Sequence, residues 1–264
     1  MFIMKTKLSL ILISLISSCF CFAKTPVYDE TYCGDCDAAN QPWKYYLTIG
    51  DAPNSLILLP DTPVIGTARF AYDEEQYLWG KALRDTPRGD QAVSDANYSV
   101  EAFSAALSEA LPFKINKEKT PKTFYLLYHM MQDAGQLATR HAKEHYMRHR
   151  PYMIYGENTC LESDQATLST DGSYPSGHTT VGWAMALVLA ELVPEYQNQI
   201  LLRGIELGQS RVICGYHFQS DVNAGRIMGA AVVARLHADK KFQADLIKAK
   251  REVKRILAKI SSQK

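Results

Sequence analysis

Apolar side chains recur at three- and four-residue steps over most of the chain after about residue 68, and this spacing restricts the possible folds more than any other feature. Such steps place the side chains on one face of an α-helix. The clearest series is Phe124, Leu127, Met131, Ala134 and Ala138. It predicts a helix from about residue 122 to Arg150, because the residue before a proline, here Pro151, avoids the α region.

Four more helices are predicted towards the C-terminus. The first begins near His178 and is strongly apolar, and the others cover about residues 195–212, 220–237 and 240–261. The last one carries an apolar stripe among many lysines, which must pack on the body of the protein or on a second subunit. We also expect a homo-oligomer. The sequence has no internal repeat and no convincing series of strands, so the predicted fold is all-α.

The predicted domain organisation has three parts. Residues 1–23 are typical of a secretory signal peptide, with a basic start, an apolar run of about 15 residues and a terminal Ala23. Residues 24–67 are rich in proline and predict an irregular N-terminal arm. Residues 68–264 form one helical domain, long enough to bury a core. We expect a periplasmic or secreted protein, with lipid anchoring at Cys19 as the alternative.

Four cysteines remain after removal of the signal peptide: Cys33, Cys36, Cys160 and Cys214. Four cysteines allow three pairings, which sequence alone does not distinguish. The first two have the spacing of a redox or zinc half-site, but no second such pair accompanies them, so we expect a local disulfide there. Export favours oxidation, and Cys160 would then pair with Cys214. Two buried free thiols are the alternative.

The formal net charge is only +1, so binding of an anion requires a local cluster of cations, and we expect no nucleic-acid partner. A first candidate cluster lies near the end of the helix predicted at about 122–150. Lys143 and Arg150 are seven residues apart, about two helical turns, so the helix would project both from nearly the same face. Taken alone, a Lys/Arg pair at this spacing is also typical of a solvent-exposed helix face, which is the alternative.

A second candidate is the stretch Gly172–Thr179, directly before the apolar helix. A helix N-terminus directs free N–H groups and the positive end of the macrodipole at one point, which suits an anion. Gly177 would let an oxyanion approach the backbone without a Cβ in the way. Ordinary capping of the helix by Ser176 or Thr179 is the alternative.

A third candidate is the stretch Ser210–Asp221, which contains Arg211 and His217. His217 and Asp221 are four residues apart and can face each other on one helical turn or across a helix start. An aspartate beside a histidine fixes the tautomer and basicity of its ring. A histidine with a purely structural role is the default for such a pair in isolation.

Taken in order, the three stretches read Lys-x6-Arg-Pro, Pro-Ser-Gly-His and Ser-Arg-x5-His-x3-Asp. This series resembles the signature shared by bacterial class A non-specific acid phosphatases, the type-2 phosphatidic acid phosphatase superfamily and vanadium haloperoxidases. Resemblance to the class A enzymes extends over about residues 68–240 and includes 95–97, 172–179, 187–191 and 208–217. It implies a helical bundle of the acid phosphatase and vanadium haloperoxidase type.

The residue types and the resemblance imply the same division of roles. Transfer of a phosphoryl group needs positioning and charge stabilisation above all. The expected phosphate ligands are Lys143, Arg150, Ser176, Gly177 and Arg211. His217, oriented by Asp221, would attack phosphorus and form a phosphohistidine. His178 would act as general acid and then as general base. The two rings must begin in opposite protonation states, which suits an acidic optimum around the ordinary histidine pKa of about 6.5.

The sequence thus predicts a broad-specificity acid phosphatase for small-molecule phosphomonoesters, with no metal or other cofactor and with phosphotransfer as a possible side activity. A vanadate-dependent haloperoxidase is the alternative, because vanadate mimics the phosphoryl group in the same pocket. No membrane-spanning run remains after signal cleavage, which disfavours a membrane lipid phosphatase. A non-catalytic phosphate-binding protein would not need both histidines. A stripe of His141, His145 and His149 lacks the His-Glu-x-x-His arrangement of metal sites, so we expect surface or subunit contacts there.

Overall fold

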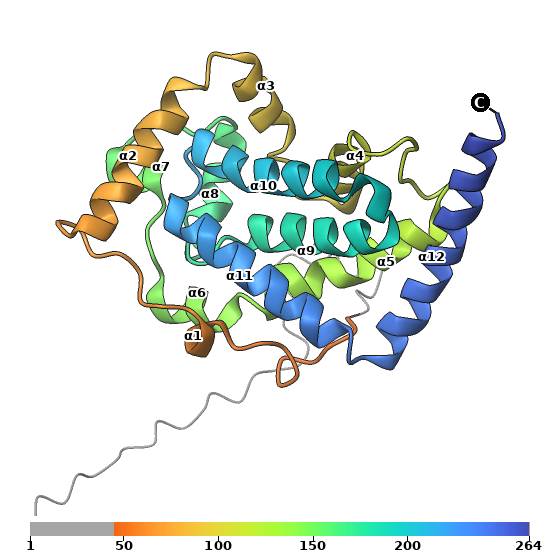
Figure 1. The fold of residues 1–264 in the computed structure, drawn as a ribbon. Coiled ribbons are helices and arrows are strands. Elements are labelled where there is room, and N and C mark those ends of the chain that lie inside the picture. The colour runs from red at the N-terminus through yellow and green to blue at the C-terminus, as the bar shows by residue number, and fades with distance from the viewer. Residues whose placement is uncertain (1–44, 264) are drawn as a thin grey trace, which may run out of the picture. The chain divides into compact units, whose positions relative to one another are not determined.

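The structure is a computed structural model that describes residues 45–263, and within this part of the chain every regular element is a helix (Figure 1). The predicted all-α fold is therefore confirmed. The predicted signal peptide, Cys33, Cys36 and the first part of the predicted arm lie outside the described residues.

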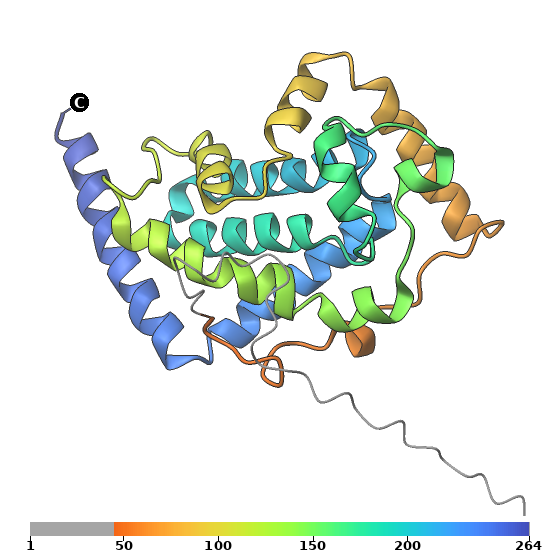
Figure 2. The same cartoon turned by 180° about the vertical axis from the view of Figure 1, so that it is seen from behind.

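Three long helices lie side by side in the body of the protein (Figures 1 and 2). They are α9 (Gly177–Leu192), α10 (Gln197–Ile213) and α11 (Gln219–Leu236), and α9 packs against both of the others. Close approach depends on small residues: a Cβ on Gly204 would lie 2.5 Å from the Cβ of Ala186. Helix α9 is apolar around most of its circumference because neighbours cover it on most sides.

At one end of the body, α5 (Pro121–Gln132) packs against α12 (Lys240–Ser261). The apolar stripe of α12 is buried through Phe242, Leu246, Ala249 and Val253. Beside this stripe, the Thr123 hydroxyl donates to the Glu252 carboxylate at 2.8 Å. The stripe therefore docks on the body of its own chain. The homo-oligomer stays a prediction.

At the other end lie α2 (Ala68–Ala82) and α3 (Pro87–Ser94), and α4 (Val100–Ser108) follows them in the chain. Thr67 and Ser99 cap α2 and α4, as side-chain oxygens at N-caps commonly do. Before α2, the described residues 45–67 contain one short helix, α1 (Ser55–Leu58), and the N-terminal arm stays a prediction.

The helix predicted from about 122 to Arg150 is wrong as a single element. Helix α5 passes into a π-helical turn, η1 (Asp133–Leu137), and α6 (Arg140–Tyr146) follows. The chain then leaves helical geometry at Met147, whose φ of 39° is left-handed. A left-handed methionine is unfavourable. The next residue compensates for this unfavourable backbone conformation, because the break orients Arg148 so that it forms two buried ion pairs.

Arg150 lies outside α6 and precedes a new helix, α7 (Pro151–Tyr155). Pro151 starts that helix at the position where proline is tolerated best. The stretch that follows contains the short helices η2 (Glu162–Asp164) and α8 (Gln165–Leu168). Among the helices of residues 45–263, none is both long enough and apolar enough to cross a bilayer.

Candidate active site

The two cations of the first stretch meet at one point although they do not share a helix. Lys143 comes from the last turn of α6, and Arg150 is the N-cap of α7. Nζ of Lys143 lies 2.5 Å from Oδ2 of Asp171, and Nη2 of Arg150 lies 3.2 Å from the same oxygen. Lys143 also donates to the carbonyl oxygen of Gly172 at 2.5 Å. The predicted convergence is therefore present, whereas the predicted reason for it, a shared helical face, is wrong.

Hydrogen bonds to the backbone fix the guanidinium of Arg150, which is only 1% exposed. Its Nε donates to the carbonyl of Leu168 at 2.8 Å, and its Nη1 donates to the carbonyl of Tyr216 at 3.2 Å. Nη1 also lies 3.1 Å from Nε2 of His217. Because a guanidinium only donates, Nε2 accepts and carries no proton in this arrangement.

A third cation of the site is Arg211, which is buried in the last turn of α10. Its guanidinium lies over the ring of Tyr216, 4.0 Å from the centroid, and donates weakly to the carbonyl of Ala96 at 3.4 Å. Its Nε has no hydrogen-bond partner among the residues that the structure describes. Burial lowers the pKa of Arg211 to about 10, so the group keeps its charge at neutral pH.

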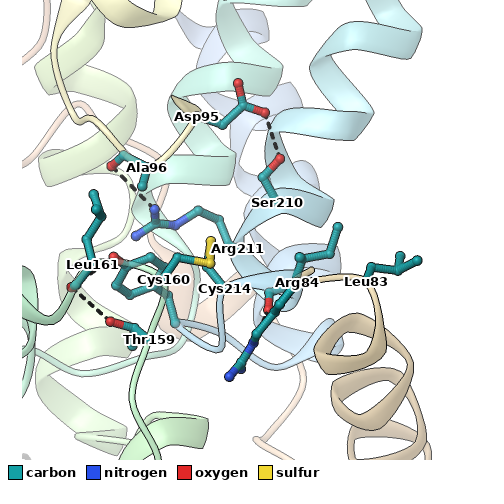
Figure 3. The surroundings of a disulfide bond; sticks show 12 residues. Leu83, Arg84, Asp95, Ala96, Thr159, Cys160, Leu161, Ser210, Arg211 and Cys214 are labelled. Atoms are coloured by element: carbon teal, nitrogen blue, oxygen red, sulfur yellow. Dashed lines mark hydrogen bonds between the residues drawn. A yellow bond between two sulfur atoms is a disulfide. The ribbon is translucent and has the colours of Figure 1, made fainter. Parts of the chain in front are cut away.

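A disulfide holds the chain beside Arg211 (Figure 3). It joins Cys160, which follows α7, to Cys214, the C-cap of α10, as expected from the sequence. The backbone N–H of Cys160 also donates to the carbonyl of Cys214 at 3.3 Å. The bond thus ties the segment after α7 to the segment between Arg211 and His217.

Asp95 supports the same end of α10 from the segment after α3. Its carboxylate accepts from Ser210 Oγ at 2.6 Å and from both terminal nitrogens of Arg203, at 2.9 and 2.5 Å. Figure 3 shows Asp95 and Ala96 above Arg211, so these contacts hold the carbonyl that Arg211 reaches.

His217 lies just before α11, and its ring is 3% exposed. Nδ1 is 3.5 Å from Oδ2 of Asp221, which is long for a direct hydrogen bond. The hydroxyl of Ser173 lies between them, 3.1 Å from Nδ1, and donates to Oδ2 at 2.6 Å. A proton on Nδ1 is thus directed at Ser173, and the lone pair of Nε2 faces Arg150.

Asp221 is itself held by further donors. The backbone N–H of Phe218 donates to Oδ2 at 2.8 Å, and Nη1 of Arg148 donates to Oδ1 at 2.5 Å. The other end of the Arg148 guanidinium donates to Asp73 of α2 at 2.8 Å. Both carboxylates are fully buried, so Arg148 compensates two charges at once.

His178 lies in the first turn of α9 and is buried. Its ring packs against Phe103 and Tyr98, with centroids 4.6 and 5.8 Å apart. Among residues 45–263, neither ring nitrogen makes a hydrogen bond of normal geometry, although the backbone of Asp95 lies close enough to oppose the lowering of the His178 pKa. A buried imidazole of this kind is costly unless something binds to it, which is typical of a functional group.

The Ser176 side chain caps α9. Its Oγ accepts from the N–H of Thr179 at 3.3 Å and lies 3.0 Å from the Thr179 hydroxyl. The capping alternative is therefore present, and it leaves the free N–H groups of the first turn beside Lys143. A Cβ on Gly177 would lie 3.1 Å from the carbonyl oxygen of Gly135 and 3.9 Å from Cε of Lys143. Close packing against η1 is thus a second reason for glycine there.

Burial and neighbouring cations change the protonation of the site. Burial, and then Arg211 and His217, hold the pKa of His178 well below its ordinary value. Burial, followed by Arg150 and Arg211, does the same to the pKa of His217. Both rings are therefore neutral near pH 6.5, which differs from the expected pair in opposite states. Burial also lowers the pKa of Lys143 to about 8.

The predicted histidine stripe does not exist as a helical feature, because α6 ends at Tyr146 and His149 lies beyond it. In the described part of the chain, no group of three or more His, Cys, Asp or Glu side chains is arranged to hold a metal ion.

Sequence reasoning missed several residues of the site. Ser173 and Asp171 lie in or next to the stretch 172–179, but no spacing rule distinguishes them from loop residues. Arg148 pairs with Asp73 across 75 positions, and only the fold brings such residues together.

A helical body thus brings the partly buried Lys143, the buried Arg150 and Arg211, two buried histidines and a helix N-terminus into one site. Residues 122–243 match the PAP2 superfamily. The chain is 50% identical over 231 residues to the non-specific acid phosphatase of Providencia stuartii, covering 88% of this chain and 93% of that protein.

Two further relatives are similar over most of their length. The non-specific acid phosphatase of Salmonella typhimurium is 43% identical over 203 residues, 77% of this chain and 81% of the relative. The acid phosphatase of Zymomonas mobilis is 34% identical over 200 residues, 76% of this chain and 75% of the relative. The chain belongs to the PAP2 superfamily.

Proposed function

We propose that this protein is an acid phosphatase that hydrolyses small-molecule phosphate monoesters, with His217 as nucleophile. One observation carries the proposal: Nε2 of His217 presents its lone pair beside Arg150 in a site that also holds Lys143. The names of the relatives, acid phosphatases that match over most of the chain, support the same activity.

The cations would bind the phosphoryl group first. Lys143, Arg150 and Arg211 supply positive charge in a buried site, where it stabilises a phosphoryl dianion more strongly than in water. The N–H groups that start α9 at Gly177 and the Ser176 hydroxyl add neutral donors. Because side chains provide this charge, we propose that catalysis needs no metal ion.

In the first chemical step, Nε2 of His217 attacks phosphorus in line with the leaving oxygen. A P–N bond forms, the P–O bond to the alcohol breaks, and His178 gives its proton to the departing oxygen. The Nδ1 proton of His217 stays directed at Ser173, whose own proton is held by Asp221. The developing positive charge on the His217 ring is therefore balanced by the buried carboxylate.

In the second step, neutral His178 takes a proton from water, the water oxygen attacks phosphorus and the P–N bond breaks. His178 must be protonated before the first step, although burial and Arg211 lower its pKa. A bound dianion opposes these effects by adding negative charge, and acidic solution supplies the proton. An acidic optimum follows for the hydrolysis of esters whose leaving group needs that proton.

Residues 1–23 would direct export to the periplasm or outside the cell and residues 24–67 would form an N-terminal arm, while residues 68–264 form the catalytic domain. Lipid anchoring at Cys19 is the alternative to soluble export. Transfer of the phosphoryl group to an alcohol instead of water is a side activity that the same intermediate allows.

The direct test is turnover of a panel of phosphomonoesters from about pH 4 to 8 in the presence of a chelator, which spans the ordinary histidine titration range. The proposal expects hydrolysis with an acidic optimum that survives chelation. Loss of activity in chelator and its recovery with a divalent ion would contradict the metal-free mechanism. Halide oxidation that requires added vanadate would instead favour the haloperoxidase alternative.

A further inference from the structure

A carboxylate from the protein itself lies among the cations of the candidate phosphate site. Oδ2 of Asp171 is 2.5 Å from Nζ of Lys143 and 3.2 Å from Nη2 of Arg150. These are the same charged donors that would bind phosphoryl oxygens. Carboxylate and phosphate oxygens compete for such donors because both accept charge-assisted hydrogen bonds from ammonium and guanidinium groups.

The three partners differ in how firmly they are held. The side chains of Lys143 and Arg150 are 12% and 1% exposed, whereas that of Asp171 is 50% exposed. The arginine is anchored by the carbonyls of Leu168 and Tyr216, and the lysine by that of Gly172. Within residues 45–263, the carboxylate of Asp171 makes its hydrogen bonds and ion pairs with these two cations alone. Its carboxylate can therefore turn into water while the cations stay in place.

We propose that Asp171 is an internal competitor of the substrate: its carboxylate occupies the donors of Lys143 and Arg150 and must be displaced before a phosphoryl group binds. The inference rests on the proposed function only in taking these two cations as phosphate ligands. It makes Asp171 a residue that sets affinity and does not take part in the reaction.

Competition of this kind has a specific quantitative signature. The apparent affinity of a ligand falls by the fraction of protein in which the site is open. That fraction belongs to the protein, so the factor is the same for every anion that displaces Asp171. Removal of the carboxylate should therefore lower KM for different monoesters, and the inhibition constants of phosphate and sulfate, by one common factor.

A purely supporting role predicts the opposite sign. Burial lowers the pKa of Lys143 to about 8, and the negative charge of Asp171 opposes this shift. If Asp171 served only to keep Lys143 charged, its removal would weaken the binding of every anion. Measurement at about pH 6 limits this effect, because the pH is then well below the pKa of Lys143 and the ammonium stays charged.

The test uses the full-length protein, the substitution Asp171→Asn and the matched control Asp85→Asn. Asp85 is an exposed aspartate on the segment after α2, so its substitution removes the same charge elsewhere on the surface. Calorimetric titration with inorganic phosphate gives the dissociation constant, and steady-state kinetics with two monoesters gives KM and kcat/KM. Asp171→Ala serves as a second neutral variant, and thermal melting verifies that each variant folds.

The expected result is phosphate binding that is roughly tenfold tighter in both neutral variants than in the wild type, the scale set by loss of one charge-assisted competitor. KM should fall by the same factor and kcat/KM should rise, while Asp85→Asn changes neither. Unchanged or weaker phosphate binding in both variants overturns the inference, and so does a factor that differs between ligands.

The phosphate titration needs no turnover, which separates this inference from the proposed function. If the neutral variants bind phosphate more tightly but the protein hydrolyses no monoester, the proposed phosphatase activity is contradicted. The proposed competition by Asp171 is then still supported. Normal hydrolysis with unchanged phosphate binding in Asp171→Asn would contradict the proposed competition by Asp171 and would still support the proposed phosphatase activity.

Discussion

The hydroxyl of Ser173 donates a hydrogen bond of 2.6 Å to Oδ2 of Asp221. The hydroxyl oxygen of Ser173 is also 3.1 Å from Nδ1 of His217, whereas Oδ2 of Asp221 is 3.5 Å from that nitrogen. The contact between the predicted nucleophile and its carboxylate therefore runs largely through a serine. Ser173 fixes which nitrogen of His217 carries the proton, and through this it acts as a positioning residue.

Removal of this hydroxyl should slow the chemical step. In Ser173→Ala, Nδ1 of His217 loses the hydroxyl oxygen that lies 3.1 Å from it, so the tautomer with a free Nε2 is less favoured. We expect kcat to fall roughly 10- to 100-fold, about 1.4–2.7 kcal/mol, with KM changed much less. Steady-state kinetics measures both. Exposed Ser163→Ala is the control, and a loss confined to KM would contradict a positioning role.

The two histidines should differ in a trapping experiment. His217→Ala should form no acid-labile phosphoenzyme, because it lacks the attacking nitrogen. His178→Ala should still form it from p-nitrophenyl phosphate, whose leaving group needs no proton. Rapid quenching with labelled substrate, followed by peptide mapping, locates the phosphate. Phosphate found on His178 in the wild type would reverse the assignment.

Local patterns were sufficient to predict the all-α fold and the bounds of the C-terminal helices. The last helix, predicted at about 240–261, covers Lys240–Ser261. The break after Tyr146 was not predictable, because neither Gly nor Pro marks it and the left-handed Met147 is unfavourable locally. Its compensation comes from Asp73 and Asp221, which contact Arg148 only in the folded chain.

Some residues of the candidate site could likewise be predicted from the sequence, and others could not. Residues within the three short stretches could be named because spacing and residue type identify them, as for His217 and Arg211. Asp171 could not be named because it is 28 positions from Lys143 in the sequence, and only the tertiary fold brings the two side chains into contact. The protonation of His178 could not be predicted either, since burial and the nearby Arg211 are properties of the tertiary structure.

Anion binding should weaken as Lys143 loses its proton. The pKa of this group is lowered to about 8 by burial, and a bound anion favours its charged form. Affinity is therefore full below pH 8 and falls as the pH rises through that value. Inhibition by sulfate, whose charge is constant over this range, should weaken from pH 7 to 9. Lys143→Met should bind sulfate more weakly at pH 7 and lack this fall, whereas an identical fall would exclude Lys143 as its cause.

Arg148 should be important for stability as well as for the site. Its removal in Arg148→Met leaves Asp73 and Asp221 buried without a cation, and such a loss typically costs about 3–5 kcal/mol. Urea unfolding at neutral pH measures the free energy. The control is Arg235→Met, which breaks a solvent-exposed pair with Asp51 and should reduce the free energy of unfolding far less. Equal losses in the two variants would contradict this account.

The disulfide between Cys160 and Cys214 should couple stability to the geometry of the site. The bond closes a loop across a separation of 54 residues. In the loop-entropy model, a ring of this size stabilises the folded state by about 4 kcal/mol, although the division into entropy and enthalpy depends on the model. A reductant should therefore lower the melting temperature. Activity should also change, because Cys214 lies between Arg211 and His217.

Peptide mapping under non-reducing conditions tests the pairing itself. We expect one peptide pair that joins Cys160 to Cys214, with Cys33 and Cys36 joined locally. The variant Cys160→Ser/Cys214→Ser supplies the control, because a reductant should then leave its melting temperature and activity unchanged. Alkylation of both cysteines in the native oxidised protein would contradict the bridge. A peptide joining Cys160 to Cys33 or Cys36 would do the same, and Arg211 and His217 would then lose their proposed covalent anchor.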